Sequence, residues 1–154
     1  MCDKVQSDEV SGEGLIGAEE EEFVRRFESC ELPPADFTHR EHVRLAWLYL
    51  RRHAAPAALE RFSTSLRRFA AFNGKPDLYH ETITWAYILL INERTARAAR
   101  TQGWEEFAAA NPDLLDWQNS VLKSYYREET LGSELAKKVF LFPDRRGETR
   151  DEAR

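Results

Sequence analysis

The chain has few cysteines and no long apolar run, and both absences restrict what it can be. Its 154 residues include two cysteines, Cys2 and Cys30, which are too few for a disulfide framework and lack the spacing of a metal site. No stretch of about 18 uncharged apolar residues is present, and the acidic N-terminus has neither the basic nor the apolar region of a signal peptide. The sequence therefore predicts a soluble, cytoplasmic protein that has no membrane partner.

The net charge of −5 is unevenly distributed along the chain. Residues 1–31 hold ten acidic and three basic residues, which leaves seventeen acidic and nineteen basic residues for the rest. Seven arginines make two of the predicted helices locally basic: Arg40, Arg44, Arg51, Arg52, Arg61, Arg67 and Arg68. No sequence signature of a nucleic-acid-binding fold accompanies them, so we interpret them as solvated helix faces and expect no nucleic-acid partner.

Strand-like alternation of apolar and polar residues is absent at any length, and apolar residues recur at helical spacing instead. We expect an all-α fold, a single-domain compact bundle of about five to six helices over residues 18–144. Residues 1–17 and 145–154 lack periodicity and are predicted to be disordered tails, the first of them acidic. The predicted helices span 18–30, 38–52, 56–72, 77–99, 104–110 and 111–126, and a last turn or two follows at 134–139.

Three of the four histidines lie at the starts of the two most apolar predicted helices, at positions His39, His42 and His80. The connections that follow the second and third predicted helices are about three to five residues long, and short connections join antiparallel neighbours. Two reversals make the second and fourth helices parallel, so their starts lie at the same end of the bundle. The three imidazoles are therefore predicted to converge.

This convergence predicts a metal site. His39 and His42 are three residues apart, which places both side chains on one helix face, about 5 to 6 Å apart. A helix N-terminus disfavours imidazolium, and the neutral imidazole is the form that binds metal. Nitrogen ligands suit Fe, Cu, Ni or Zn, among which the sequence does not distinguish.

Further residues are predicted to complete the site. Glu81 follows His80 and could act as a general base, as a metal ligand, or as a residue that orients a histidine. Tyr49 lies on the same helical stripe as His42, and Thr84 and Tyr87 continue the stripe of His80. We assign catalytic roles to Glu81, Tyr49 and Tyr87, and substrate binding to Thr84 and to Trp47, one of the aromatic residues near the site.

Each of these features also has an architectural interpretation. Thr38 and Glu41 fit a capping box, Asp77 fits an N-cap, and Glu81 fits a first-turn acid that the helix dipole favours. Histidines are more often core or surface residues than metal ligands. A zincin-type peptidase is disfavoured because Thr84 occupies the place of the second histidine in H-E-x-x-H.

Two segments carry recognisable motifs: Phe37 to His42 reads F-x-H-x-x-H, and Tyr79 to Thr82 reads Y-H-E-T. Together with the segment Tyr125–Asp144, they resemble a small bacterial family of mostly uncharacterised all-helical proteins. The resemblance spans roughly residues 30–145 and implies no activity or cofactor. It implies that the Tyr125–Asp144 segment belongs with the site, and we include Tyr126 among the substrate-binding residues on that basis.

The sequence thus predicts a small metal-dependent enzyme that acts on a small organic molecule, for example as an oxygenase or a lyase. Two alternatives stay open. One is a non-enzymatic helical module that binds a ligand or a partner and has structural histidines. The other is a metal-free enzyme in which His80 and Glu81 carry out acid–base chemistry. A homo-oligomer is compatible with all three.

Overall fold

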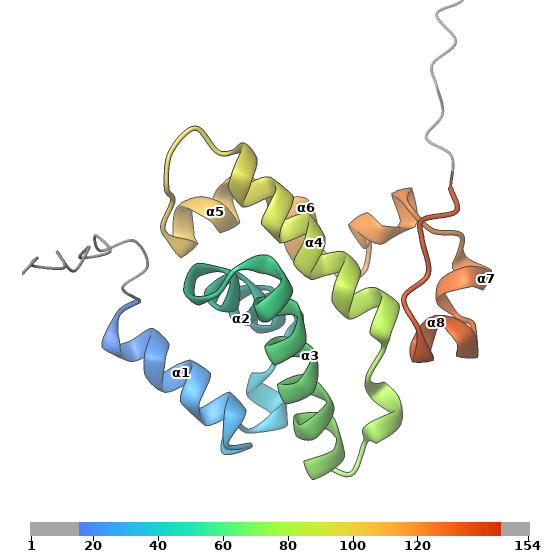
Figure 1. Cartoon of the computed structure of the whole chain (residues 1–154), viewed down its shortest axis with the longest axis horizontal. Helices are drawn as coiled ribbons and strands as arrows, with labels where there is room; N and C mark the ends of the chain where they lie inside the picture. The colour runs from blue at the N-terminus through green and yellow to red at the C-terminus, as the bar shows by residue number, and fades with distance from the viewer. Residues whose placement is uncertain (1–15, 146–154) are drawn as a thin grey trace, which may run out of the picture.

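A computed structural model describes residues 16–145, and this part of the chain is all-α (Figure 1). The predicted tails fall mainly on residues 1–15 and 146–154, which lie outside the described residues. The α-helices are α1 (Ala18–Glu28), α2 (His39–Arg52), α3 (Ala55–Phe72), α4 (Glu81–Arg97), α5 (Trp104–Ala110), α6 (Pro112–Leu115), α7 (Glu128–Leu131) and α8 (Glu134–Lys138). Three 3-10 turns lie at Pro34–Asp36, Pro76–Leu78 and Val121–Ser124.

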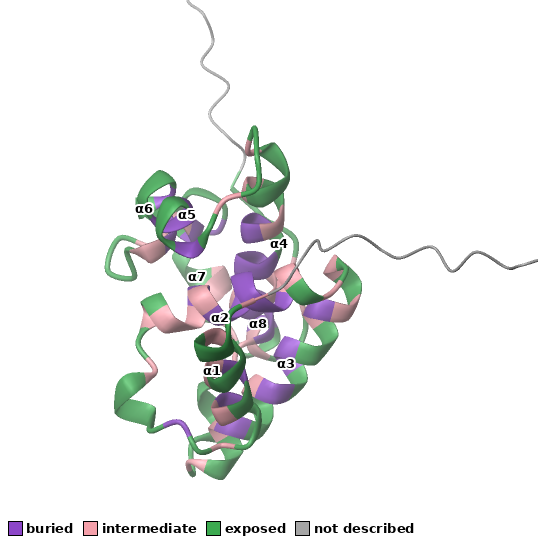
Figure 2. Cartoon of the chain, turned by 90° about the vertical axis from the view of Figure 1, so that its left-hand side faces the viewer, coloured by how far each residue is buried: buried purple, intermediate pink, exposed green. Residues whose placement is uncertain are grey.

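Helix α2 is the centre of the bundle. It packs against α1, α3, α4 and α6, and its residues from Leu45 to Tyr49 are all buried. A helix that is apolar around most of its circumference needs neighbours on several sides. In Figure 2 the buried residues of α2, α3 and α4 face one another, whereas α1 exposes most of its surface. The buried apolar side chains from Val24 to Tyr126 form one cluster.

The starts of the second and fourth helices lie close together, as predicted. Helices α2 and α4 pack against each other, and their N-terminal residues line the same hollow. The first connection is short, at residues 53–54, but the second is longer than predicted and covers residues 73–80. Pro76 begins a 3-10 turn there, so α4 starts at Glu81 and not at Asp77.

The prediction of one helix over residues 111–126 is wrong. Helix α6 ends at Leu115, an irregular segment follows, and Val121–Ser124 forms a 3-10 turn. Two polar side chains form hydrogen bonds with nearby backbone groups in place of a helix: Asp116 accepts from the backbone N–H of Asn119 and Ser120 from that of Leu122. Such local bonds compete with helix formation.

The predicted capping box at the start of α2 is also absent. Thr38 occupies the N-cap position without a side-chain hydrogen bond, and the Glu41 carboxylate lies 3.7 Å from the guanidinium of Arg44 instead. Glu41 therefore forms an ion pair with Arg44 on its own helix and does not cap α2.

Buried Thr82 attaches the C-terminal segment to α4. Its hydroxyl lies 2.8 Å from the carbonyl oxygen of Ala136 and 2.9 Å from that of Val139, and it accepts a hydrogen bond from the N–H of Leu141 at 3.1 Å. A hydroxyl has one proton and two lone pairs, so it can serve both carbonyls and the amide at once only by sharing its proton. This one side chain orders the chain that follows α8.

We expect Thr82→Val to lower the free energy of unfolding by about 2 kcal/mol, because valine keeps the shape of threonine but leaves the buried partner groups without a hydrogen bond. Urea denaturation measures the change. Thr95→Val is the matched control, because Thr95 is exposed on the same helix. Equal losses in the two variants would show that the Thr82 hydroxyl contributes nothing.

Candidate functional site

A hollow of about 550 Å³ lies where the first turns of α2 and α4 approach α3. We call it the histidine hollow, because His39, His42 and His80 all line it. Its walls are largely apolar and come from all three helices: Val43, Ala46, Phe62, Leu66, Phe69 and Ile88. No acidic residue is among the described residues that line it. The three imidazoles therefore converge on one hollow, as predicted.

His80 is the N-cap of α4, and both of its ring nitrogens are hydrogen-bonded. Its Nδ1 accepts from the backbone N–H of Ile83 at 3.1 Å, and its Nε2 lies 2.7 Å from the carbonyl oxygen of Leu131. Since Nδ1 accepts, the ring proton is on Nε2 and is donated to Leu131. His80 thus caps one helix and binds α7 in the neutral form.

His39 has one nitrogen engaged. Its Nε2 lies 2.8 Å from the carbonyl oxygen of Leu114, and its ring packs against the rings of Tyr87 and Trp117, with centroids 5.1 and 5.0 Å away. Burial lowers the pKa of His39, and the hydrogen bond to Leu114 and the charge of Asp116 partly oppose this shift. When Nε2 donates to Leu114, Nδ1 keeps a lone pair for another partner.

His42 differs from the other two because no hydrogen bond to its ring is present among residues 16–145. The ring lies against Phe37, with 3.7 Å between the centroids, and lines the hollow one turn beyond His39. Burial, with a smaller contribution from His39, lowers the pKa of His42 to about 4. His42 is therefore a neutral, half-buried imidazole with one donor and one acceptor that no described residue uses.

Two of the other predicted site residues also line the hollow. Thr84 is buried on α4, one turn from His80, and Tyr87 lies one turn further in the sequence. The Tyr87 hydroxyl is 2.9 Å from the Oγ of Ser120, and burial raises its pKa. Tyr87 therefore positions the segment after α6 and supplies a polar edge to the hollow.

Tyr49, Trp47 and Tyr126 do not line the histidine hollow. The Tyr49 hydroxyl donates to the carboxylate of Glu28 at 2.7 Å, and the Trp47 ring packs against Trp104. The Tyr126 hydroxyl donates to the carbonyl oxygen of Leu141 at 2.8 Å. All three are buried. Tyr49 and Trp47 are turned toward α1 and α5 by their positions on α2, whereas Tyr126 precedes α7 and lines a second hollow beside the first.

Glu81 is buried, but it is turned away from the hollow. Its carboxylate forms an ion pair with Arg67 and accepts a hydrogen bond from the hydroxyl of Tyr79 at 3.2 Å. It does not line the hollow, since successive helix residues point about 100° apart. This arrangement gives Glu81 a structural role and separates it from His80.

The sequence analysis did not include Trp117 and Phe37 in the site, although both rings contact its histidines. Trp117 falls within the helix predicted over residues 111–126, yet about half of its surface is exposed. The polar residues beside it, Asp116, Gln118 and Asn119, were the available signal that this tryptophan lies on a loop.

The histidines do not fit a three-nitrogen metal site as they are arranged here. Among the described residues, no group of three His, Cys, Asp or Glu side chains is placed to hold a metal ion. Both ring nitrogens of His80 form hydrogen bonds with backbone groups, and so does one ring nitrogen of His39. Ligation by all three would require His80 to leave its capping position.

Comparisons with models of protein families, with curated proteins and with solved structures found no match for this chain. The resemblance to a bacterial family therefore stays a prediction. Within residues 16–145, none of the helices has the length and apolar character needed to cross a membrane.

The lowered pKa of His42 predicts a pH-dependent stability. The free histidine titrates at 6.5 and the folded one at about 4, so between these values the unfolded chain binds a proton that the folded protein excludes. Stability therefore falls as the pH falls from 6.5 to 4. Urea denaturation at pH 7 and pH 4.5 should show that His42→Leu reduces this loss by about 2 kcal/mol. The same pH dependence in both proteins would contradict the burial of His42.

Proposed function

We propose that the chain binds a small, largely apolar organic molecule in the histidine hollow and that His42 forms a hydrogen bond with it. The observation that carries this proposal is the His42 imidazole, which is half-buried, lines the largely apolar hollow and has no hydrogen-bond partner among the described residues. A ligand that fills the hollow would exclude water from this ring and could form the hydrogen bond that the protein itself does not supply.

The size and composition of the hollow support the same proposal. Ligand sites are usually concave and mainly apolar, have volumes of about 300 to 1,000 Å³, and contain a few polar groups that fix the orientation of the ligand. In the histidine hollow those groups are His42, the free nitrogen of His39 and the hydroxyl of Thr84. A hydroxyl, carbonyl or amide group on the ligand would match them, since a neutral imidazole both donates and accepts.

Acid–base chemistry on the bound molecule would fall to His42 and not to His80 with Glu81. A neutral imidazole can accept a proton from a bound molecule. His80 has no free nitrogen, and the Glu81 carboxylate faces Arg67. The side chains of the hollow therefore support ligand binding more strongly than they support proton transfer.

Binding of 1-octanol and of indole, followed by NMR, tests the proposal with one aliphatic and one aromatic probe. We expect at least one probe to bind saturably and to shift the backbone amide signals of Ala46, Thr84 and Ile88. The His42→Leu variant should weaken that binding about tenfold, because it removes one hydrogen bond worth about 1.4 kcal/mol. The same variant should be about 1 kcal/mol more stable without ligand, because leucine suits the apolar walls of the hollow better than an imidazole without a partner does.

His53→Leu serves as the matched control, because His53 is a C-cap residue outside the hollow. It should leave the affinity for both probes unchanged. If neither 1-octanol nor indole binds saturably, or if His42→Leu binds as tightly as the wild-type protein, the proposed function is wrong.

The convergence of three imidazoles on one hollow supports a second candidate, a metal-dependent enzyme acting on a small organic molecule. In that case His39, His42 and His80 would hold one Fe, Cu, Ni or Zn ion, at the expense of the hydrogen bonds that His80 and His39 now make.

Elemental analysis of protein purified without a histidine tag tests this candidate. Near-stoichiometric metal in the wild-type protein is expected, together with its loss from His39→Ala, His42→Ala and His80→Ala but not from His53→Ala. Protein that contains no metal and takes up none of the four ions on titration would exclude it.

A further inference from the structure

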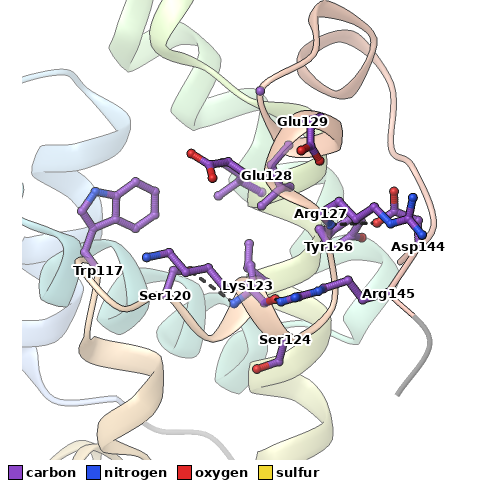
Figure 3. Close-up of a pocket in the computed structure, with 14 residues that line it drawn as sticks. Trp117, Ser120, Lys123, Ser124, Tyr126, Arg127, Glu128, Glu129, Asp144 and Arg145 are labelled. Atoms are coloured by element: carbon purple, nitrogen blue, oxygen red, sulfur yellow. Dashed lines mark hydrogen bonds between the residues drawn. The ribbon is translucent and has the colours of Figure 1, made fainter. Parts of the chain in front are cut away.

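A second hollow lies beside the first, and its lining is mainly polar. We call it the polar hollow; it has a volume of about 1410 Å³ and is formed by the segment from Trp117 to Gly132 together with Asp144 and Arg145 (Figure 3). Ile83 and Trp117 line both hollows. The hydrogen bond from His80 to the carbonyl oxygen of Leu131 also joins them, because Leu131 lines the polar hollow.

Trp117 forms the boundary between the two hollows. Its ring packs on His39, with 5.0 Å between the centroids, and 53% of its surface is exposed. The residue lies on the irregular segment after α6, so helix geometry does not fix its position. A molecule in the histidine hollow that extends past this ring enters the polar hollow.

The charged side chains of the polar hollow are balanced in sign. Three are basic and three are acidic: Lys123, Arg127, Arg145, Glu128, Glu129 and Asp144. Asp144 accepts from the backbone N–H of Arg127 and from the hydroxyl of Thr130, and Arg145 donates to the carbonyl oxygen of Lys123. These two charged groups are therefore already bound to the protein.

Lys123 and Glu128 lie nearer to Trp117, and so to the histidine hollow, than the other charged side chains of the polar hollow do (Figure 3). In Figure 3 both side chains extend toward Trp117, from two sides of the open space. The Lys123 ammonium donates to the carbonyl oxygen of Gln118 at 2.9 Å, which holds it beside Trp117. Within residues 16–145, neither Lys123 nor Glu128 forms an ion pair.

We propose that the two hollows form one binding site for a small amphipathic zwitterion. The apolar body occupies the histidine hollow, and a head group with one positive and one negative charge lies between Glu128 and Lys123. Glu128 would repel a head group with only a negative charge, and Lys123 would repel one with only a positive charge. Such repulsion between like charges lowers the affinity. A zwitterion satisfies both side chains. This inference rests on the proposed function, since it places the apolar body in the histidine hollow.

Three probes of eight carbons each separate the contributions of the head group: 2-aminooctanoic acid, octanoic acid and octylamine. Calorimetry at pH 7 should show that 2-aminooctanoic acid binds about fivefold more tightly than either of the others, because one exposed charge pair contributes up to about 1 kcal/mol. Lys123→Gln should reduce its affinity to that of octylamine. Glu128→Gln should reduce its affinity to that of octanoic acid.

Lys138→Gln and Glu60→Gln are the matched controls, because both residues are exposed and line neither hollow. They should leave all three affinities unchanged. The inference is overturned if octanoic acid or octylamine binds as tightly as 2-aminooctanoic acid, or if Lys123→Gln and Glu128→Gln weaken binding no more than the controls do.

The neutral probe 1-octanol distinguishes this failure from a failure of the proposed function. If 1-octanol binds and the zwitterion binds no more tightly, the histidine hollow is a ligand site and only the head-group assignment is wrong. If neither 1-octanol nor indole binds, and the zwitterion does not bind either, both proposals are wrong.

Discussion

The two hydrogen bonds of His80 hold together the parts of the molecule that form the candidate site. One bond caps α4 at the backbone of Ile83, and the other joins α4 to α7 through the carbonyl oxygen of Leu131. Thr82, two residues later, binds α8 at Ala136 and the chain that follows it at Val139 and Leu141. The first turn of α4 thereby forms a wall of the histidine hollow and also positions the segment that encloses the polar hollow. His80 is consequently more important for the architecture than for direct contact with a ligand.

His42 presents the opposite situation on the neighbouring helix. A polar ring in an apolar environment normally has a hydrogen-bond partner, because the alternative destabilises the fold. Leucine would fit the same helical stripe, because the His42 ring packs on Phe37 and lines a largely apolar hollow. Stability alone therefore gives no reason for a histidine at this position, whereas binding a ligand does. The contrast with His80, whose two nitrogens are both used, shows that similar residues at similar helix starts serve different purposes.

Most of the helical architecture could be predicted from the sequence, and so could the convergence of the histidines. Apolar spacing and the proline and glycine signals located α1, α2, α3 and α5 within a few residues, and chain reversal brought the starts of α2 and α4 together. The breakdown of the helix after Pro112 could not be predicted from apolar spacing, because it depends on individual hydrogen bonds made by Asp116 and Ser120. For the same reason the sequence did not show which nitrogens were free. The ring nitrogens of His80 bind backbone groups, and a backbone carbonyl such as that of Leu131 leaves no mark in a sequence pattern.

The space beside His42 exists because the three surrounding helices present small side chains there. Ala46 on α2, Ala70 on α3 and Thr84 on α4 all line the hollow. Protein interiors are otherwise closely packed, and a cavity costs stability in proportion to its volume. Leucine at any of these positions would fill part of the space and would suit the apolar environment. Small residues on three separate helices, beside an imidazole without a partner among the described residues, are the arrangement expected of the ligand site proposed for this hollow. Its outer end opens past Trp117, where the lining changes from apolar to charged. A molecule that fills both hollows must therefore be apolar on one side of Trp117 and charged on the other.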